Sequence, residues 1–302
     1  MTLVITVVTH HGLWQSTDHQ LTQVGAEALP DPSVKHIYLE AEDGKALIAY
    51  AGIGKVRNMQ ISEWVRSVLH GRKRNLVSHM SVLREAANRK LLPISKATGT
   101  PHTFSIAAYE NSQPTLYLIT NCVLQDGKYI PGNIFDWRRL VLKDTHYKEA
   151  INVEGQGALA LSGIEDRKML IRTIRQRVKK PSFGKDVAVT MAYLNMKASK
   201  DQRSNGSVSQ NCMVTHLASS TDGSVHWYFG WDTAAEKPIL QTVMGGFDVT
   251  NIIETLLPLS EPILKKQLEA LQKGEQCDEE VDTEVLNEAL RRNYKKPSDE
   301  FE

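Results

Sequence analysis

The sequence predicts an α+β fold in which two antiparallel sheets pack together, paired helices cover their outer faces and a helical extension follows. Three observations predict it. A β-branched run at residues 2–9 is typical of a buried strand at the start of the chain. Hairpin patterns then alternate with pairs of segments at helical spacing. From about residue 249 only helical spacing is left. We therefore expect a main domain at 1–248 and a helical extension at 249–302 that ends in a charged tail.

Hairpins account for most of the predicted strands. The first joins residues 2–9 to residues 13–17 through a turn at His10-His11-Gly12. The second contains Asp43-Gly44, a strong turn signal between two apolar runs. The paired arms of the second, third and last hairpins are 36–40 with 46–51, 103–109 with 115–119, and 212–218 with 225–231.

Helical spacing marks the segments between these hairpins. Residues 56–71 place their apolar side chains on one face, and Gly71 ends the segment. Residues 76–91 form a second helical pattern, which we expect Pro93 to end. The extension repeats the spacing in two apolar stripes: Leu264, Leu268 and Leu271, then Val285, Leu286 and Leu290.

The middle of the chain is less regular. Residues 121–156 are interpreted as an irregular insertion, followed by a short apolar strand at 158–161. The pattern Ser162-x-x-Glu165 is typical of a capping box and predicts the start of a helix. A further helix is predicted at residues 187–200.

Composition narrows the classes of partner. The 302 residues carry 36 basic and 35 acidic side chains, so a net charge of +1 gives no field that favours nucleic acid or an anionic membrane. No apolar stretch approaches the roughly 18 residues that would cross a bilayer. Three cysteines without C-x-x-C spacing suit reduced thiols. We expect a soluble cytoplasmic protein that needs no cofactor and no metal.

A set of residues at the ends of the first strands has the chemistry of a nucleophilic site. Thr2 is followed by Asp18 sixteen residues later, at the end of the second predicted strand. Lys35 precedes the third predicted strand, and Ala51-Gly52 closes the fourth. Further along are Ser162-Gly163 and Asp201-Gln202-Arg203-Ser204-Asn205-Gly206.

These motifs, in this order, resemble those of proteasome β-type subunits, which are N-terminal-nucleophile (Ntn) hydrolases. The resemblance covers roughly residues 2–60 and 103–231, and it implies a four-layer αββα sandwich. It departs from the family pattern at His19-Gln20, where Ser-Arg is usual, and at Asn205, where the family has Gly. Lys35 also lies one residue late, so the chain looks like a divergent, bacterial-type relative.

The resemblance implies a role for each motif. Thr2, exposed by removal of Met1, is the nucleophile, and its own α-amine is the base. Lys35 stabilises the developing alkoxide and Asp18 holds that lysine. The N–H of Gly52 meets the oxyanion. The remaining members of the set lie further out: Asp201 and Ser204, which orient the α-amine, and Ser162, which matches the family's Ser-Gly.

The function that follows is a threonine-type hydrolase of amide or peptide bonds. Two alternatives stay open, a catalytically silent scaffold subunit and a hydrolase of small, non-peptide amides. We also expect a homo-oligomer with contacts from the helical tail, and an insertion at residues 121–156 that narrows access to Thr2. The resemblance also implies a possible unfoldase as a partner, but no residue of the sequence identifies one.

Overall fold

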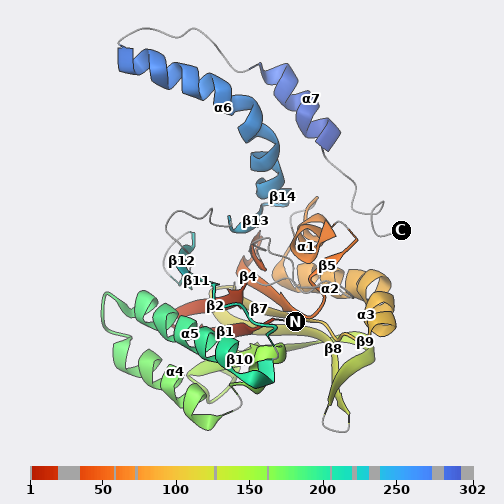
Figure 1. The fold of residues 1–302 in the computed structure, drawn as a ribbon, viewed down its shortest axis with the longest axis vertical. Coiled ribbons are helices and arrows are strands. Elements are labelled where there is room, and N and C mark those ends of the chain that lie inside the picture. Colours follow the sequence, from red (N-terminus) through yellow and green to blue (C-terminus); the bar gives the residue numbers. More distant parts are fainter. Residues whose placement is uncertain are drawn as a thin grey trace.

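The computed structural model describes residues 2–19, 35–57, 59–71, 74–125, 128–161, 163–204, 206–219, 223–230, 239–273 and 282–293. It is an α+β structure in which two large sheets pack face to face (Figure 1). The strands are β1 Val4–Thr9, β2 Gly12–Asp18, β3 His36–Ala41, β4 Gly44–Ala51, β5 Lys55–Val56, β6 Met59–Gln60, β7 Thr103–Glu110, β8 Gln113–Gln125, β9 Lys128–Val141, β10 Glu149–Glu154, β11 Cys212–Ala218, β12 Val225–Phe229, β13 Gln241–Met244 and β14 Phe247–Asp248. The helices are α1 Ile61–Leu69, α2 Leu76–Ala86, η1 Ala87–Leu91, α3 Leu92–Thr98, η2 Leu142–Asp144, η3 Gln156–Leu159, α4 Ile164–Arg177, α5 Phe183–Lys200, η4 Gln202–Ser204, α6 Val249–Lys273 and α7 Thr283–Asn293.

The two sheets differ in their pairing. The five-stranded sheet has the order β10-β1-β2-β11-β12 and is antiparallel throughout. The seven-stranded sheet has the order β14-β13-β3-β4-β7-β8-β9, and within it β13 runs parallel to β3. The expectation of two purely antiparallel sheets is therefore wrong for one of them. No tight turn joins β13 to β3, so nothing in the connection imposes an antiparallel pairing.

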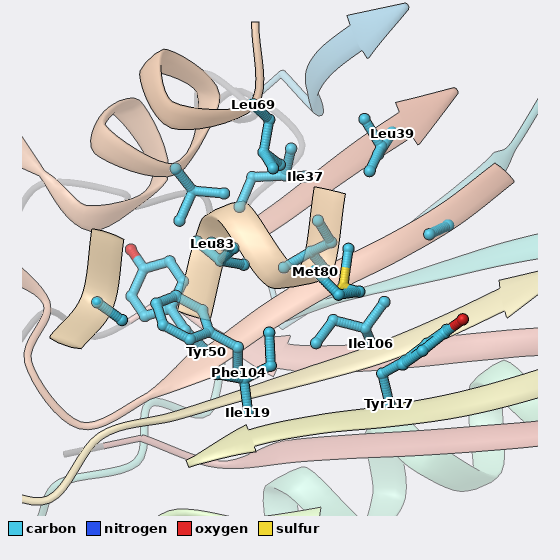
Figure 2. Close-up of a cluster of buried hydrophobic side chains, with 14 of the residues drawn as sticks. Ile37, Leu39, Tyr50, Leu69, Met80, Leu83, Phe104, Ile106, Tyr117 and Ile119 are labelled. Carbon is cyan, nitrogen blue, oxygen red and sulfur yellow. The ribbon is translucent and has the colours of Figure 1, made fainter. Parts of the chain in front are cut away.

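Helices cover the outer face of each sheet. On the seven-stranded sheet, α1 and α2 bury Leu69, Met80 and Leu83 against strand residues such as Ile37 and Ile106 (Figure 2). On the five-stranded sheet, α4 and α5 do the same, and the buried residues there include Ile5, Trp14, Leu170, Ile174, Val187 and Met191. This apolar burial stabilises the helices, whose own propensity is a weaker force.

The inner faces of the sheets form a third core. Val8 and Leu13 of the first hairpin pack with Leu47 of β4 and Tyr109 of β7. Near the start of β1, Val4 packs with Ala49 and Ala51 at the end of β4. Small alanines at this point let the first strand lie close to β4. The head of β1 is thereby fixed against the opposite sheet.

The helix at Pro93 continues where the sequence predicted an end. The helix that starts at Leu76 passes through a π-helical segment, η1, and runs on as α3 to Thr98. Pro93 lies in the first turn of α3, where the wider π turn has already displaced the normal hydrogen bonding. Gly99, at φ +66°, ends the helix instead.

The segment at 121–156 is also more regular than predicted. It completes β8, forms β9 and supplies β10, which pairs antiparallel with β1 from Val4 opposite Glu154 to Thr9 opposite Glu149. The β8–β9 hairpin extends beyond the rest of its sheet (Figure 1). The strand predicted at 158–161 is wrong, since η3 covers residues 158 and 159 and a turn covers residues 160 and 161. Gly155, at φ +90°, breaks the extended conformation just before it.

The C-terminal helices are present as predicted. Figure 1 shows α6 rising away from the sheets and α7 returning beside it. The base of α6 is fixed by an ion pair of 2.6 Å between Arg66 and Asp248, both nearly buried. Further out, Leu264 and Leu268 are 52% and 57% exposed. Within the described ranges, no helix is both long and apolar enough to span a membrane.

Candidate active site at the head of the first strand

Three predicted site residues meet where the sheets face each other. Thr2 precedes β1, Asp18 ends β2 and Lys35 precedes β3. Antiparallel pairing sets Val4 opposite Thr17, which brings the end of β2 beside the head of β1. Lys35 comes from the other sheet. All three residues are at most 3% exposed.

Hydrogen bonds join the three side chains. The Thr2 hydroxyl donates to Asp18 Oδ1, and Lys35 Nζ donates to the Thr2 Oγ1. Lys35 Nζ also donates to Asp18 Oδ1 at 3.1 Å. The backbone N–H groups of Leu3, at 3.0 Å, and Ser209, at 3.2 Å, donate to the same carboxylate. Asp18 is thereby fixed from both sides, and it fixes the other two residues.

Burial sets the electrostatics of this cluster. Loss of solvent lowers the pKa of the Lys35 ammonium, while the charge and hydrogen bond of Asp18 act in the opposite direction. Burial, followed by the charges of His19, His226 and Lys35, holds the pKa of His36 well below its usual range. His36 is therefore neutral at pH 7 and adds no second cation beside Lys35.

Gly52 occupies a position that only glycine fits. It follows β4 at φ +116°, a backbone conformation that is unfavourable for any residue with a Cβ atom. A Cβ atom there would lie 2.3 Å from the carbonyl oxygen of Pro101. The neighbouring Ala51 packs against Val4, so the Gly52 backbone is held close to the head of β1.

A second glycine, Gly155, belongs to the site and was not identified from the sequence. Its φ is +90°, and a Cβ atom there would lie 1.9 Å from the Thr2 carbonyl oxygen and 3.4 Å from the Ala51 Cβ. Gly155 therefore lets the chain after β10 close over the backbone of Thr2. The only signal was the close pair of glycines, Gly155 and Gly157, in a segment interpreted as irregular.

The other predicted residues lie further out or beyond the described ranges. Ser162 lies outside the described residues, and the N-cap of α4 is Gly163, with no side-chain capping bond. The Ser204 hydroxyl donates to the carbonyl of Ala198 at 2.6 Å. The Asp201 carboxylate accepts from Arg203 at 2.8 Å, which lowers the pKa of Asp201 to about 2. Among the described residues, neither Asp201 nor Ser204 forms a hydrogen bond with Thr2.

A cavity of about 560 Å³ opens beside the cluster. Ala51, Gly52 and Gly155 are among the residues that line it, whereas Thr2 is not. Gly52 and Gly155 therefore lie between Thr2 and the cavity. Several other lining residues come from the segment at 121–156, namely Cys122, Lys128, Tyr129, Arg138, Val153 and Glu154.

A larger cavity, of about 1110 Å³, lies elsewhere, between the β3–β4 turn, β12, β13 and the base of α6. None of the predicted site residues lines it. Across the described ranges, no group of three or more His, Cys, Asp or Glu side chains is arranged to hold a metal ion.

Comparison with known proteins gives remote likenesses only. No family model matches the chain, and no curated protein matches it. Among solved structures, a mutant of Anbu from Hyphomicrobium sp. strain MC1 is similar, with 15% identity and a TM-score of 0.43, over 92% of this chain and 100% of that one. Anbu from the same strain is also similar, with 14% identity and a TM-score of 0.40 over the same shares of the two chains. Likenesses this remote carry no conclusion about the reaction.

Proposed function

We propose that this protein is a threonine-type Ntn hydrolase that cleaves amide bonds through an acyl-enzyme on Thr2, once Met1 has been removed. The observation that carries the proposal is the buried cluster in which Thr2 Oγ1 lies between Lys35 Nζ and Asp18 Oδ1. A lysine, a carboxylate and a threonine hydroxyl in direct contact are the groups that activate such a nucleophile. Helices on the outer faces of both packed sheets also suit an αββα sandwich.

Each residue has a defined role in the proposed reaction. The α-amine of Thr2, with a usual pKa near 7.7–8.0, takes the hydroxyl proton as Oγ1 attacks the amide carbon. Lys35 stabilises the alkoxide, and Asp18 keeps Lys35 charged and in place. The N–H of Gly52 stabilises the tetrahedral oxyanion. The amine leaves with the proton, and water activated by the α-amine releases the acyl group.

The proposed roles of Asp201 and Ser204 are indirect. Both belong to the loop that follows α5, and Ser204 is buried there. The same loop continues to Ser209, whose N–H donates to Asp18. We assign Asp201 and Ser204 to holding this loop, and so to positioning Asp18. Ser162 is kept as a candidate site residue because it matches the family's Ser-Gly motif.

One observation favours the alternative of a silent scaffold subunit. Thr2 is only 3% exposed, and it does not line the adjacent cavity. A silent subunit would keep the same cluster as an ion pair that stabilises the fold. The two functions differ in whether Oγ1 reacts.

Intact-mass measurement with a β-lactone or epoxyketone probe tests the proposal. We expect the purified protein to lack Met1 and to gain one covalent probe. Thr2→Ala should abolish both labelling and amidase activity, while Thr283→Ala, which removes an exposed hydroxyl on α7, should change neither. An active enzyme that retains Met1, or full activity in Thr2→Ala, would exclude the proposed nucleophile.

A further inference from the structure

The floor of the 560 Å³ cavity is one face of the seven-stranded sheet. The residues that form it are neighbours across four strands: Ala51 pairs with Thr103, Thr103 with Thr120, and Leu118 with Arg138. All five line the cavity. The hydroxyls of Thr103 and Thr120 are hydrogen-bonded at 2.6 Å. The floor therefore runs from small residues at the Thr2 end, through hydroxyls, to a cation on β9.

Two cations that line the cavity form no ion pair with a carboxylate of the described residues. They are Arg138 and Lys128, both on β9, and neither forms an ion pair with any of the residues that the structure describes. The adjacent Arg139 is different. It points to the other face of the strand, where it forms an ion pair with Glu110 at 2.8 Å. The positive charges on β9 that form no ion pair therefore lie on the cavity side of the sheet.

One acidic residue, Glu154, also lines the cavity. Burial raises the pKa of Glu154, and the pKa of Cys122 is raised to about 11 by burial and by the charge of Glu154. Glu154 is thus close to Cys122. With Glu154 ionised the three charged lining residues sum to +1, and with it protonated they sum to +2.

The spacing of the strands gives the length of the site. Gly52 follows β4, and Arg138 lies on β9, three strands further along the sheet. At roughly 4.8 Å per strand this is about 14 Å across the sheet. Through Leu118 and Ser105, Arg138 is in register with Ala49, so it is also displaced along the strands from Gly52.

From this geometry we infer that the cavity binds a carboxylate of the substrate through Arg138, with Lys128 adding positive charge further along the β8–β9 hairpin. The inference rests on the proposed function for the position of the scissile bond. Guanidinium binds a carboxylate through two parallel hydrogen bonds, and the lysine adds a second charge. The substrate class is therefore an acidic peptide or an amide of an acidic amino acid.

Calorimetry on the full-length Thr2→Ala protein tests binding without turnover. The probes are acetyl-Glu-Glu-amide, acetyl-Gln-Gln-amide and acetyl-Lys-Lys-amide. We expect the glutamate peptide to bind about tenfold more tightly than the glutamine peptide, and the difference to shrink as salt is added. Arg138→Ala should remove most of the difference, and Arg138→Glu should shift the preference toward the lysine peptide.

The control is Arg89→Ala, which removes an exposed guanidinium from η1, away from the cavity. It should leave the preference for the glutamate peptide intact. Equal affinity for the glutamate and glutamine peptides, or an equal loss in Arg89→Ala and Arg138→Ala, would overturn the inference. Thermal unfolding of each variant shows that the comparison is made on folded protein.

Failure of the inference and failure of the proposed function give different results. If Thr2 does not react with the probe but the Thr2→Ala protein prefers the glutamate peptide, the hydrolase proposal fails and the carboxylate site stands. If Thr2 reacts and the peptides bind equally, the enzyme stands and the carboxylate site fails.

Discussion

Lys35 and Thr2 precede strands of different sheets, and the ammonium of Lys35 donates a hydrogen bond to the hydroxyl of Thr2 between the two sheets. The contact exists because the head of β3 faces the head of β1 when the two sheets pack. Lys35 is only 2% exposed, so its charge is compensated by Asp18 and not by solvent. The cluster is thus both an intersheet contact and the candidate catalytic centre.

Replacing Lys35 tests its proposed role on the alkoxide. Lys35→Ala should lower the amidase rate by a factor on the order of 10²–10³, as loss of an oxyanion-hole donor does. Lys35→Arg should not restore the rate, because the planar guanidinium is larger and does not fit the position of the ammonium. Steady-state kinetics measures both. A rate for Lys35→Ala within about threefold of the wild type would assign the stabilising charge to another residue.

Gly155→Ala should lower both stability and probe labelling more than Gly245→Ala does. The added Cβ would meet the Thr2 carbonyl oxygen at 1.9 Å, so the chain must shift at the nucleophile. We expect a loss of about 3 kcal/mol or more in the free energy of unfolding, together with loss of probe labelling. Chemical denaturation and intact mass measure the two effects.

The matched control for Gly155 is Gly245→Ala. Gly245 also has a positive φ, +57°, but a Cβ atom there meets nothing within 4 Å. Only the backbone cost of about 1–2 kcal/mol is expected, with labelling unchanged. If the two variants lose the same stability and both are labelled, Gly155 does not position Thr2.

The raised pKa of Glu154 predicts that the free energy of unfolding depends on pH. Burial raises the pKa of this carboxyl in the folded state, so the folded protein binds more protons than the unfolded chain between the usual carboxyl pKa and the raised value. Stability due to Glu154 therefore falls as the pH rises through that interval, and the loss persists at pH 7. Glu154→Gln should raise the free energy of unfolding at pH 7 relative to wild type, with a smaller gain at pH 4.

Denaturant titrations at the two pH values measure this effect. Glu261→Gln, which changes an exposed carboxyl on α6, is the control and should give no such difference. The same gain at both pH values in Glu154→Gln would mean that packing, and not the charge, is responsible.

The helical extension predicts assembly. We expect a homo-oligomer in which the exposed stripe of α6 packs against another copy, and light scattering should report a mass above that of one 302-residue chain. Shortening the chain must spare Asp248, because its loss would leave the buried guanidinium of Arg66 without its closest partner. A chain that ends at Ser260 keeps this ion pair and removes Leu264 and Leu268.

The shortened chain and a surface variant separate the possibilities. Loss of assembly in the Ser260 chain and in Leu264→Glu/Leu268→Glu, but not in Lys265→Glu, would support contacts through the stripe. A monomeric full-length protein would refute the oligomer. Unchanged assembly after shortening would refute only the role of the extension.

Local signals in the sequence predicted much of the fold. The first two hairpins were predicted because β-branched runs and Asp43-Gly44 act over a few residues. The helix through Pro93 was cut short because a π-helical turn leaves no periodic signal. Strand β10 was missed because its pairing partner, β1, lies about 140 residues away in the chain, which no local pattern reports.

The sequence likewise predicted some residues of the candidate site and missed others. Thr2, Asp18 and Lys35 were proposed from the resemblance to a family motif at the ends of clearly marked strands, and the structure brings their side chains together. Gly155 was missed because its importance comes from a contact with Thr2 that exists only after folding. Asp201 and Ser204 were assigned to the α-amine by motif alone, and the structure places both in hydrogen bonds with residues other than Thr2.

The backbone contact between Ser209 and Asp18 has a consequence for synthesis of the protein. A nascent chain that has left the ribosome only as far as β9 already has β2 but lacks β10, the other strand that pairs with β1. It also lacks Gly155, which closes over Thr2, and the N–H of Ser209, which donates to Asp18. The threonine emerges first, yet its surroundings are assembled from residues translated much later. If Thr2 is the nucleophile that we propose, its surroundings would be complete only when the C-terminal part of the main domain has folded.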